Sequence, residues 1–221
     1  MSTNLNQKHD AATDRPALVY LADPMCSWCW GFSPVIEQIV EQYGDEARIR
    51  VLAGGLYPGT TEPMTHHFKA AVREHWQHVN RRAGQPFDFG FFDRDRFVYD
   101  SEPPCRALVT VREHHPELTL PMLRALHSAF YNENRDITDP AVLREVAAGI
   151  GLDPREFAEA FESEAMRKRT QDDFDLAREL GMRGLPTLLG YDHNSVVTIT
   201  EGYRGLDEVK SDLDKWLTQV G

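Results

Sequence analysis

Apolar positions near the start of the chain follow a strand–helix–strand pattern. Residues 17–22 form a short, wholly apolar run flanked by prolines, which is typical of a buried strand. Apolar residues then recur at helical spacing over residues 35–43, and Gly44 is placed to end that helix. Residues 48–53 alternate between polar and apolar, like a second strand. We therefore expect a parallel βαβ unit.

The end of the chain returns to strand patterns. Residues 187–189 and 196–200 are rich in leucine, valine and threonine, and they flank the turn sequence Asp-His-Asn-Ser at residues 192–195. Such a turn between two short β-prone runs predicts an antiparallel hairpin. Residues 206–220 carry apolar side chains on one helical face, so a helix is expected to close the fold.

The middle of the chain has helical periodicity only. Asp139-Pro140 and Asp153-Pro154 are helix-start signals, and Gly151 and Gly181 fall where helices should stop. An all-helical block inside a strand-containing chain indicates an inserted subdomain. Helices are predicted over residues 63–84, 104–115, 118–131, 140–150, 154–161 and 164–180.

Two cysteines, Cys26 and Cys29, lie where the first strand gives way to the first helix. Unpaired backbone N–H groups at a helix start carry partial positive charge and favour a thiolate over a thiol. Two intervening residues on a helical turn bring the two sulfur atoms within bonding range. One thiolate can then attack a disulfide, and the other can displace the mixed disulfide that forms. The pair therefore predicts a redox-active dithiol.

A zinc site is the competing interpretation of the same cysteines. A structural zinc ion needs four ligands, whereas the chain offers this pair, the distant Cys105 and scattered histidines. His75 and His78 share a helical face, but no carboxylate–histidine motif completes a site. We therefore expect no bound metal.

Composition narrows the class of protein further. Asp and Glu outnumber Lys and Arg by 35 to 24, for a net charge of −11, which argues against nucleic acid or an anionic membrane as partner. No window approaches the apolar length of a membrane span. The polar start, residues 1–15, lacks the apolar core of a signal peptide, so a cytoplasmic location is expected.

Three short stretches carry a resemblance to a known family. They are Asp-Pro-Met-Cys-Ser-Trp-Cys-Trp-Gly-Phe at residues 23–32, Glu-Pro-Pro-Cys-Arg-Ala at 102–107 and Gly-Leu-Pro-Thr at 184–187. Together with the order of elements, they make the chain resemble the DsbA family, and within it the cytoplasmic, FrnE-like branch, over residues 17–220. The resemblance implies an α/β fold of the thioredoxin type (βαβ…ββα) with a large all-helical insertion.

The pattern of elements also divides the chain. It predicts a flexible tail over residues 1–15, and with the resemblance it indicates a discontinuous thioredoxin-like domain made of residues 16–60 and 182–221. Residues 61–181 would form the helical insertion subdomain.

The same resemblance assigns roles at the dithiol. Cys26 would be the exposed nucleophile and Cys29 the more buried resolving thiol. Pro186 would follow a cis peptide bond and face the dithiol, leaving a backbone edge free to pair with an extended substrate. Residues expected to contact the substrate lie beside these groups. They are Trp28, Trp30, Leu185 and Thr187.

The residues around the cysteines set an expectation for the redox potential. Ser27-Trp28 supplies no cation between the cysteines, and Asp23 adds a negative charge nearby. A less stabilised thiolate makes the disulfide less oxidising. We expect a potential in the lower half of the range of roughly −270 to −120 mV that thioredoxin-like proteins span.

Two further features remain open at this point. Cys105 could face the site as a third thiol, although a lone cysteine in an apolar helix is more often core. An aromatic-rich segment could line a groove for an apolar substrate, although packing between helices is expected for most of its members. These aromatic residues are Phe87, Phe89, Phe91, Phe92, Phe97 and Tyr99.

The function expected first is a thiol–disulfide oxidoreductase or isomerase acting on protein or small-molecule disulfides, as a monomer or homodimer. The dithiol itself would be the redox group, with no other cofactor, and glutathione or the thioredoxin system could recycle it. One alternative is a glutathione-linked isomerase or transferase of the kappa class, which carries serine at the position of Cys26 and needs no Cys29. Another is a non-enzymatic peptide-binding module with the cysteines as a zinc clip.

Overall fold

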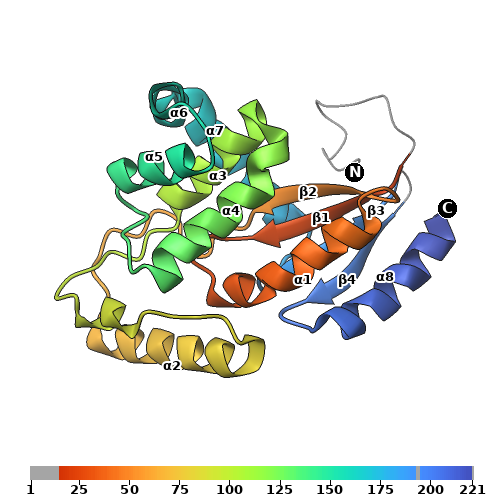
Figure 1. Cartoon of the computed structure of the whole chain (residues 1–221), viewed down its shortest axis with the longest axis horizontal. Coiled ribbons are helices and arrows are strands. Elements are labelled where there is room, and N and C mark those ends of the chain that lie inside the picture. The colour runs from red at the N-terminus through yellow and green to blue at the C-terminus, as the bar shows by residue number, and fades with distance from the viewer. Residues whose placement is uncertain (1–14, 193–194, 221) are drawn as a thin grey trace.

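A computed structural model describes residues 15–192 and 195–220 (Figure 1). The tail expected over residues 1–15 lies outside this part of the chain, Arg15 excepted, as do the two central residues of the hairpin turn. The described chain folds around one mixed sheet with helices on both of its faces (Figure 1).

The sheet has four strands in the order β2-β1-β3-β4. β1 (Ala17–Ala22) pairs parallel with β2 (Arg48–Ala53). β3 (Thr187–Tyr191) pairs antiparallel with β1 on one side and with β4 (Val196–Glu201) on the other. The predicted βαβ unit and hairpin are therefore confirmed, and the fold is thioredoxin-like with a helical insertion.

Alternate residues of β1 face two separate layers of helices. Leu18 and Tyr20 belong to the main hydrophobic core, which also holds residues of α1 (Ser27–Tyr43) and α8 (Leu206–Val220). The neighbouring residues of β1 pack instead against the layer of α7. Such alternation follows from the two-residue period of a strand, and burial on both sides explains why the run is wholly apolar.

The contact between α8 and the sheet depends on a glycine. A Cβ atom added at Gly190 of β3 would lie 2.4 Å from the Trp216 ring. The absence of a side chain at residue 190 lets the indole lie directly on the strand, which fixes the helix against the sheet.

The regular elements of the insertion are helices, as the periodicity predicts, apart from one isolated β-bridge between Pro63 and Val98. The helix expected over residues 118–131 is present: α4 continues without a gap into a π-helical turn, and a 3₁₀ turn precedes it. The remaining helices follow their predicted ranges to within a few residues. The insertion contains α2 (His66–Ala83), α3 (Glu102–His114), α4 (Thr119–His127), α5 (Pro140–Gly149), α6 (Pro154–Glu162) and α7 (Glu164–Glu179), with shorter turns at Phe89–Asp93, Pro116–Leu118 and Ser128–Asn132.

The aromatic-rich segment packs around Trp76 of α2. The Trp76 ring is fully buried and lies 5.0 Å from Phe91 and 4.8 Å from Phe92, measured between ring centroids. Phe97 and Tyr99 are also buried. The aromatic segment therefore packs α2 against the rest of the insertion. This agrees with the expectation that most of these side chains pack between helices.

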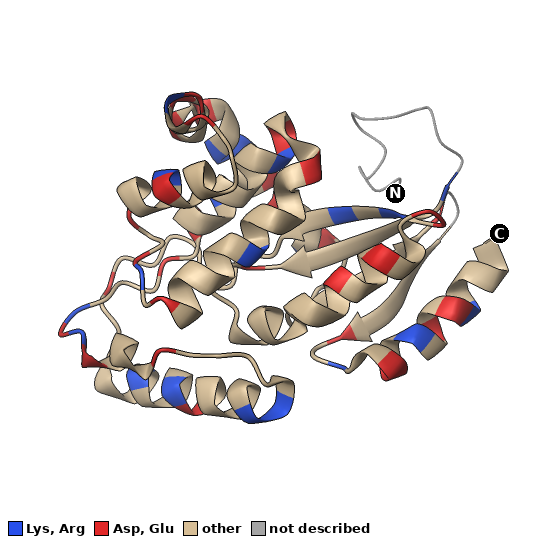
Figure 2. Ribbon diagram, in the orientation of Figure 1, with Lys and Arg blue, Asp and Glu red and all other residues tan. Residues whose placement is uncertain are grey.

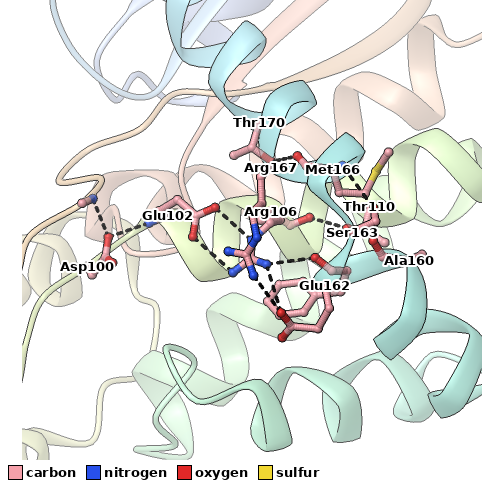
Figure 3. A network of polar contacts seen from close by, with 12 residues as sticks. Asp100, Glu102, Arg106, Thr110, Ala160, Glu162, Ser163, Met166, Arg167 and Thr170 are labelled. Carbon is pink, nitrogen blue, oxygen red and sulfur yellow. Dashed lines mark hydrogen bonds and ion pairs between the residues drawn. The ribbon is translucent and has the colours of Figure 1, made fainter.

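A buried arginine joins α3 to α6 (Figure 3). The Arg106 guanidinium lies over the Phe161 ring at 4.0 Å and donates a hydrogen bond of 2.9 Å to the Phe161 carbonyl. Its Nε atom lies 2.9 Å from a carboxylate oxygen of Glu102, one turn earlier on α3. Because the cation has both a carboxylate and a carbonyl partner, its burial between the helices is compensated.

Charge is distributed unevenly over the helices (Figure 2). α2 carries four Lys and Arg residues against a single Glu, although the whole chain is acidic. In the described residues, no helix is both long and apolar enough to cross a membrane.

Candidate active site

Cys26 occupies the start of α1. It is the N-cap residue, with an extended backbone (φ −93°, ψ 110°), and its carbonyl accepts the first helical hydrogen bond from the Trp30 N–H at 3.1 Å. The residue is only 5% exposed, so the expectation of an exposed cysteine is wrong for Cys26. Its Sγ atom lies 3.8 Å from the carbonyl oxygen of Leu185, on the segment leading into β3. The predicted position at a helix N-terminus is confirmed.

Cys29 lies one turn further along α1 and is fully buried. Burial raises the pKa of the Cys29 thiol well above its ordinary value, and the hydrogen bond and charge interaction with Cys26 raise it further. Cys29 therefore holds its proton more tightly than a free cysteine. Such a thiol reacts only once the proton has been removed.

The peptide bond between Leu185 and Pro186 is cis. The Pro186 carbonyl accepts a hydrogen bond of 2.7 Å from the Gly202 N–H, so this carbonyl is already occupied. Leu185 is half-buried and offers its carbonyl toward Cys26. The Leu185 backbone therefore faces the Cys26 sulfur, whereas the Pro186 carbonyl pairs with Gly202.

Thr187 does not occupy the substrate-contacting position expected from the sequence. Its side chain is buried and donates a hydrogen bond of 2.8 Å to the Gly184 carbonyl. Its backbone pairs with Leu21 on one side and with Glu201 on the other. The expectation is wrong for this residue because β3 lies inside the sheet, where both edges of the strand are taken.

The two tryptophans near the cysteines have different surroundings. Trp28 is half-buried and packs against the Tyr203 ring at 5.5 Å. Trp30, also expected to contact substrate, is only 4% exposed. It donates a hydrogen bond of 3.0 Å to the Pro86 carbonyl and stacks against Tyr131. Trp30 is therefore a core residue, because Pro86 and Tyr131 of the insertion cover it.

Asp23 is buried behind the cysteines and contacts the third thiol. Its carboxylate accepts hydrogen bonds from the N–H groups of Met25 (2.7 Å) and Leu56 (2.6 Å). Burial raises the pKa of the Asp23 carboxyl despite these donors. The Cys105 thiol donates to the same carboxylate across 3.3 Å.

Cys105 lies in the hydrophobic core with Ala53, Val109 and Phe174. Burial raises the pKa of its thiol well above the ordinary value, and the neighbouring Asp23 adds to the effect. Cys105 has the surroundings of a protonated core thiol, the alternative that the apolar pattern of its helix favours.

The sequence pattern gave no sign of His127, which lies fully buried beneath the dithiol segment. Its Nε2 atom is 3.1 Å from the Asp23 carbonyl, and its Nδ1 atom is 3.3 Å from the Ser33 hydroxyl. The Ser33 hydroxyl also lies 3.3 Å from the Cys29 carbonyl. Burial lowers the pKa of His127 to about 4. The neutral imidazole therefore links the start of α1 to α4.

A pocket of about 390 Å³ opens beside the dithiol. One wall comes from Trp28, between the two cysteines, and from Leu185, whose carbonyl faces Cys26. The other walls come from Gly202 and Tyr203 after β4 and from His78 and Arg82 of α2. No local pattern marks the α2 residues as part of the site, since only the packing of α2 brings them there.

Comparison with known proteins assigns this architecture to a family. Residues 18–213 match the DsbA-like thioredoxin domain, so the match runs from β1 to α8 and includes the insertion. The chain belongs to the DsbA-like thioredoxin domain family. The resemblance drawn from the cysteine, proline and insertion patterns is thereby confirmed at the level of the family.

Two solved structures of this family are similar over their whole length. A candidate protein disulfide isomerase from Nitrosomonas europaea is 36% identical, with a TM-score of 0.89 over 94% of this chain and 100% of that one. The cytosolic disulfide reductase DsbM from Pseudomonas aeruginosa is 29% identical, with a TM-score of 0.75 over 92% of this chain and 99% of DsbM. DsbM has also been solved with GSH.

Curated relatives have a different described role. The ClpXP adapter protein SpxH of Bacillus subtilis is 26% identical over 176 residues, which make up 79% of this chain and 58% of SpxH. The DsbA-like chain thus spans less than two thirds of the length of that relative.

Proposed function

We propose that this DsbA-like protein is a thiol–disulfide oxidoreductase in which Cys26 is the nucleophile and Cys29 the resolving thiol. The observation that carries the proposal is the position of the Cys26 sulfur. It belongs to the N-cap residue of α1 and lies 3.8 Å from the Leu185 carbonyl. The backbone before Pro186 is therefore placed to hold a substrate next to the sulfur.

The reaction proceeds in two exchanges. The Cys26 thiolate attacks one sulfur of a substrate disulfide, forms a mixed disulfide and releases the other substrate sulfur as a thiolate. Cys29 then loses its proton and attacks the Cys26 sulfur, which releases the second substrate thiolate and leaves a Cys26–Cys29 disulfide. The substrate gains two electrons, and the protein dithiol loses them. Each step is reversible, so the potential decides the net direction.

A reductase or isomerase acting in the cytoplasm fits the surroundings of the dithiol better than a strong oxidase. Ser27-Trp28 supplies no cation to stabilise the Cys26 thiolate, and burial disfavours the Cys29 thiolate. Similarity to a cytosolic reductase that has been solved with GSH supports the same direction. Substrates are protein or small-molecule disulfides, with glutathione or the thioredoxin system returning the dithiol to its reduced state.

The test is a redox titration of the purified protein in glutathione buffers, with free thiols alkylated and counted by mass. A reversible transition of two thiols, confined to Cys26 and Cys29, is expected, with a midpoint in the lower half of the range of about −270 to −120 mV. Cys26→Ser should abolish the transition. Absence of any two-thiol transition in the wild type would rule out the proposal.

The SpxH relatives favour a second candidate function, an adapter that binds a partner protein. An adapter needs the surface of the fold and not the exchange reaction. Saturable binding of this protein to purified ClpXP, retained when Cys26 and Cys29 are both replaced by serine, would support that function. Loss of binding in the serine variant would tie the interaction to the dithiol.

A further inference from the structure

The pocket beside the dithiol joins an apolar surface to a cationic one. Trp28, Leu185 and Tyr203 supply the apolar walls, and the side facing α2 presents His78 and Arg82. These two residues are four positions apart on one helix, so their side chains lie on the same face. A ligand in the pocket would contact nitrogen donors at one end while its other end approaches Cys26.

The cationic side is not neutralised within the part of the chain that the structure describes. No carboxylate lines the pocket, and the Arg82 guanidinium makes no ion pair with any described residue. The guanidinium lies over the Tyr203 ring, 5.7 Å from the ring centroid. A guanidinium that stacks its face on an aromatic ring keeps its edge, with five N–H donors, available to a planar anion such as a carboxylate.

Arg81, next to Arg82 at the end of α2, adds a second positive charge near the pocket, whereas Lys69 and Arg73 contact the segment around Phe92. Four Lys and Arg residues lie on this helix with one Glu, in a chain of net charge −11 (Figure 2). Charged residues on helix surfaces commonly serve only solubility. Here the helix with an excess of positive charge is the one that lines the pocket. A concentration of cations beside a low-dielectric wall attracts anionic ligands selectively.

Close packing places α2 at the dithiol. A Cβ atom added at Gly31 of α1 would lie 2.9 Å from Val79 Cγ1 and 3.1 Å from Ala83 Cβ of α2. Glycine at residue 31 therefore lets the two helices approach closely, two residues after Cys29. Val79 and Ala83 directly follow His78 and Arg82, so this contact also fixes the position of these two residues.

We infer that this pocket selects small disulfides that carry carboxylates, with Arg82 binding a carboxylate while the disulfide reaches Cys26. His78 adds a second donor, and Trp28 and Tyr203 contact the carbon chain of the substrate. The inference rests on the proposed oxidoreductase function and gives its substrate class. Neutral disulfides react at the same cysteine, but their reaction is not accelerated by a charge contact with Arg82.

The experiment compares two disulfides with the same reduced protein. Oxidised glutathione bears carboxylates, and bis(2-hydroxyethyl) disulfide bears only hydroxyl groups. The second-order rate constant for loss of the two protein thiols is measured with each disulfide at one pH and low ionic strength. The variants are Arg82→Gln, the conservative Arg82→Lys, and Arg81→Gln as a matched control, because Arg81 is also exposed but does not line the pocket.

Arg82→Gln should slow oxidation by oxidised glutathione about fivefold more than oxidation by the neutral disulfide, as for loss of a partly exposed charged contact. Arg82→Lys should recover most of the rate, and Arg81→Gln should lose less than about twofold. Added salt should slow the glutathione reaction of the wild type more than that of Arg82→Gln.

Two results would overturn the inference. Equal slowing of both disulfides by Arg82→Gln would mean that Arg82 only supports Tyr203. Equal effects of Arg81→Gln and Arg82→Gln would mean a diffuse field with no binding site. Failure of the wild type to react with either disulfide would instead contradict the oxidoreductase function itself, so the two failures are distinguishable.

Discussion

The sulfur of Cys26 lies 3.8 Å from the carbonyl oxygen of Leu185, although 159 positions separate the two residues in the chain. The contact joins the first βαβ unit to the hairpin across the whole helical insertion. It brings a nucleophile at a helix N-terminus to the backbone that precedes Pro186. The proposed thiol–disulfide exchange depends on this contact between Cys26 and Leu185.

Resolution of the mixed disulfide should accelerate with pH, because the raised pKa keeps Cys29 mostly protonated near neutrality. Burial is the largest cause and persists in the mixed disulfide, whereas the effect of the Cys26 thiolate is lost there. At pH values below the pKa of Cys29, we expect the rate of the second step to increase about tenfold for each unit by which the pH is raised. A chromogenic aromatic disulfide reports both steps, since one chromophore is released by Cys26 and a second by Cys29.

The Cys29→Ser variant is the control for this measurement. It should release one chromophore at every pH and retain the other on Cys26, which mass spectrometry detects. A second release in the wild type that does not change between neutral and alkaline pH would contradict the burial of a protonated Cys29.

His127 should make the protein sensitive to acid. Burial lowers its pKa to about 4 from the ordinary 6.5, so between these values the unfolded chain binds the proton and the folded protein does not. The associated stability is present above about pH 6.5 and is lost as pH falls toward 4. The loss amounts to about 3 kcal/mol of unfolding free energy. Urea unfolding at a series of pH values measures it.

His127→Gln separates this effect from other acid-sensitive groups. The amide can replace the donor to the Asp23 carbonyl but cannot titrate. The variant should therefore show a flatter decline of unfolding free energy between pH 6.5 and 4, whatever its stability at neutral pH. Asp23, whose raised pKa acts in the opposite sense, is present in both proteins and cancels in the comparison. Parallel curves for wild type and variant would count against a buried neutral imidazole.

Gly31→Ala should separate α1 from α2. The added methyl group meets Val79 at 2.9 Å and Ala83 at 3.1 Å, and overpacking of this kind costs about 1–3 kcal/mol. Better helix propensity of alanine returns up to about 1 kcal/mol. We expect a small net loss of stability by urea unfolding. The preference for oxidised glutathione over the neutral disulfide should fall as well, because Arg82 moves with α2.

The double variant Gly31→Ala/Val79→Ala is the matched test of that cause. Removing the Val79 methyl groups makes room for the new one, so part of the glutathione preference should return. A double-mutant cycle isolates the coupling between the two sites. Strictly additive effects would indicate that the helices do not approach at Gly31.

Arg106→Met should destabilise the helical insertion (Figure 3). The Arg106 side chain is 6% exposed and contacts both Glu102 and the Phe161 carbonyl. Its removal leaves the partly buried Glu102 carboxylate without its cation, at a cost of about 2–4 kcal/mol. Arg167→Met is the control, because the Arg167–Glu162 pair is 42% and 53% exposed and should contribute less than about 1 kcal/mol. Urea unfolding of both variants should show this difference, and equal effects would contradict it.

Local patterns predicted most of the fold. The wholly apolar run of β1, the alternation of β2 and the Asp-Pro starts of α5 and α6 each produced the expected element. Their causes lie within a few residues of each other, as in the capping of α6 by the Asp153 carboxylate. The π-helical turn that continues α4 at Ser128–Asn132 was not predicted, since no proline or glycine marks it.

Burial at the site was the least predictable quantity. Trp28 and Trp30 are two residues apart and chemically identical, yet one lines the pocket and the other packs under the insertion. Thr187 stands one position after Pro186 and is nevertheless enclosed between two strands. Neither outcome is encoded in neighbouring residues, because each depends on which distant segment covers the side chain.

The sequence by itself determined the dithiol, its position at a helix start, the proline before the hairpin and the membership of the family. The dithiol and its position arise from short-range rules of helix capping, strand alternation and cysteine spacing, whereas the family and the role of the proline follow from the resemblance. Tertiary structure alone decided which groups surround the sulfurs. It brought Leu185 to Cys26, buried Asp23 and His127 behind the dithiol, and set Arg82 at the pocket. The physical reason is that close packing joins residues by shape and volume across the whole chain, and not by their distance in sequence.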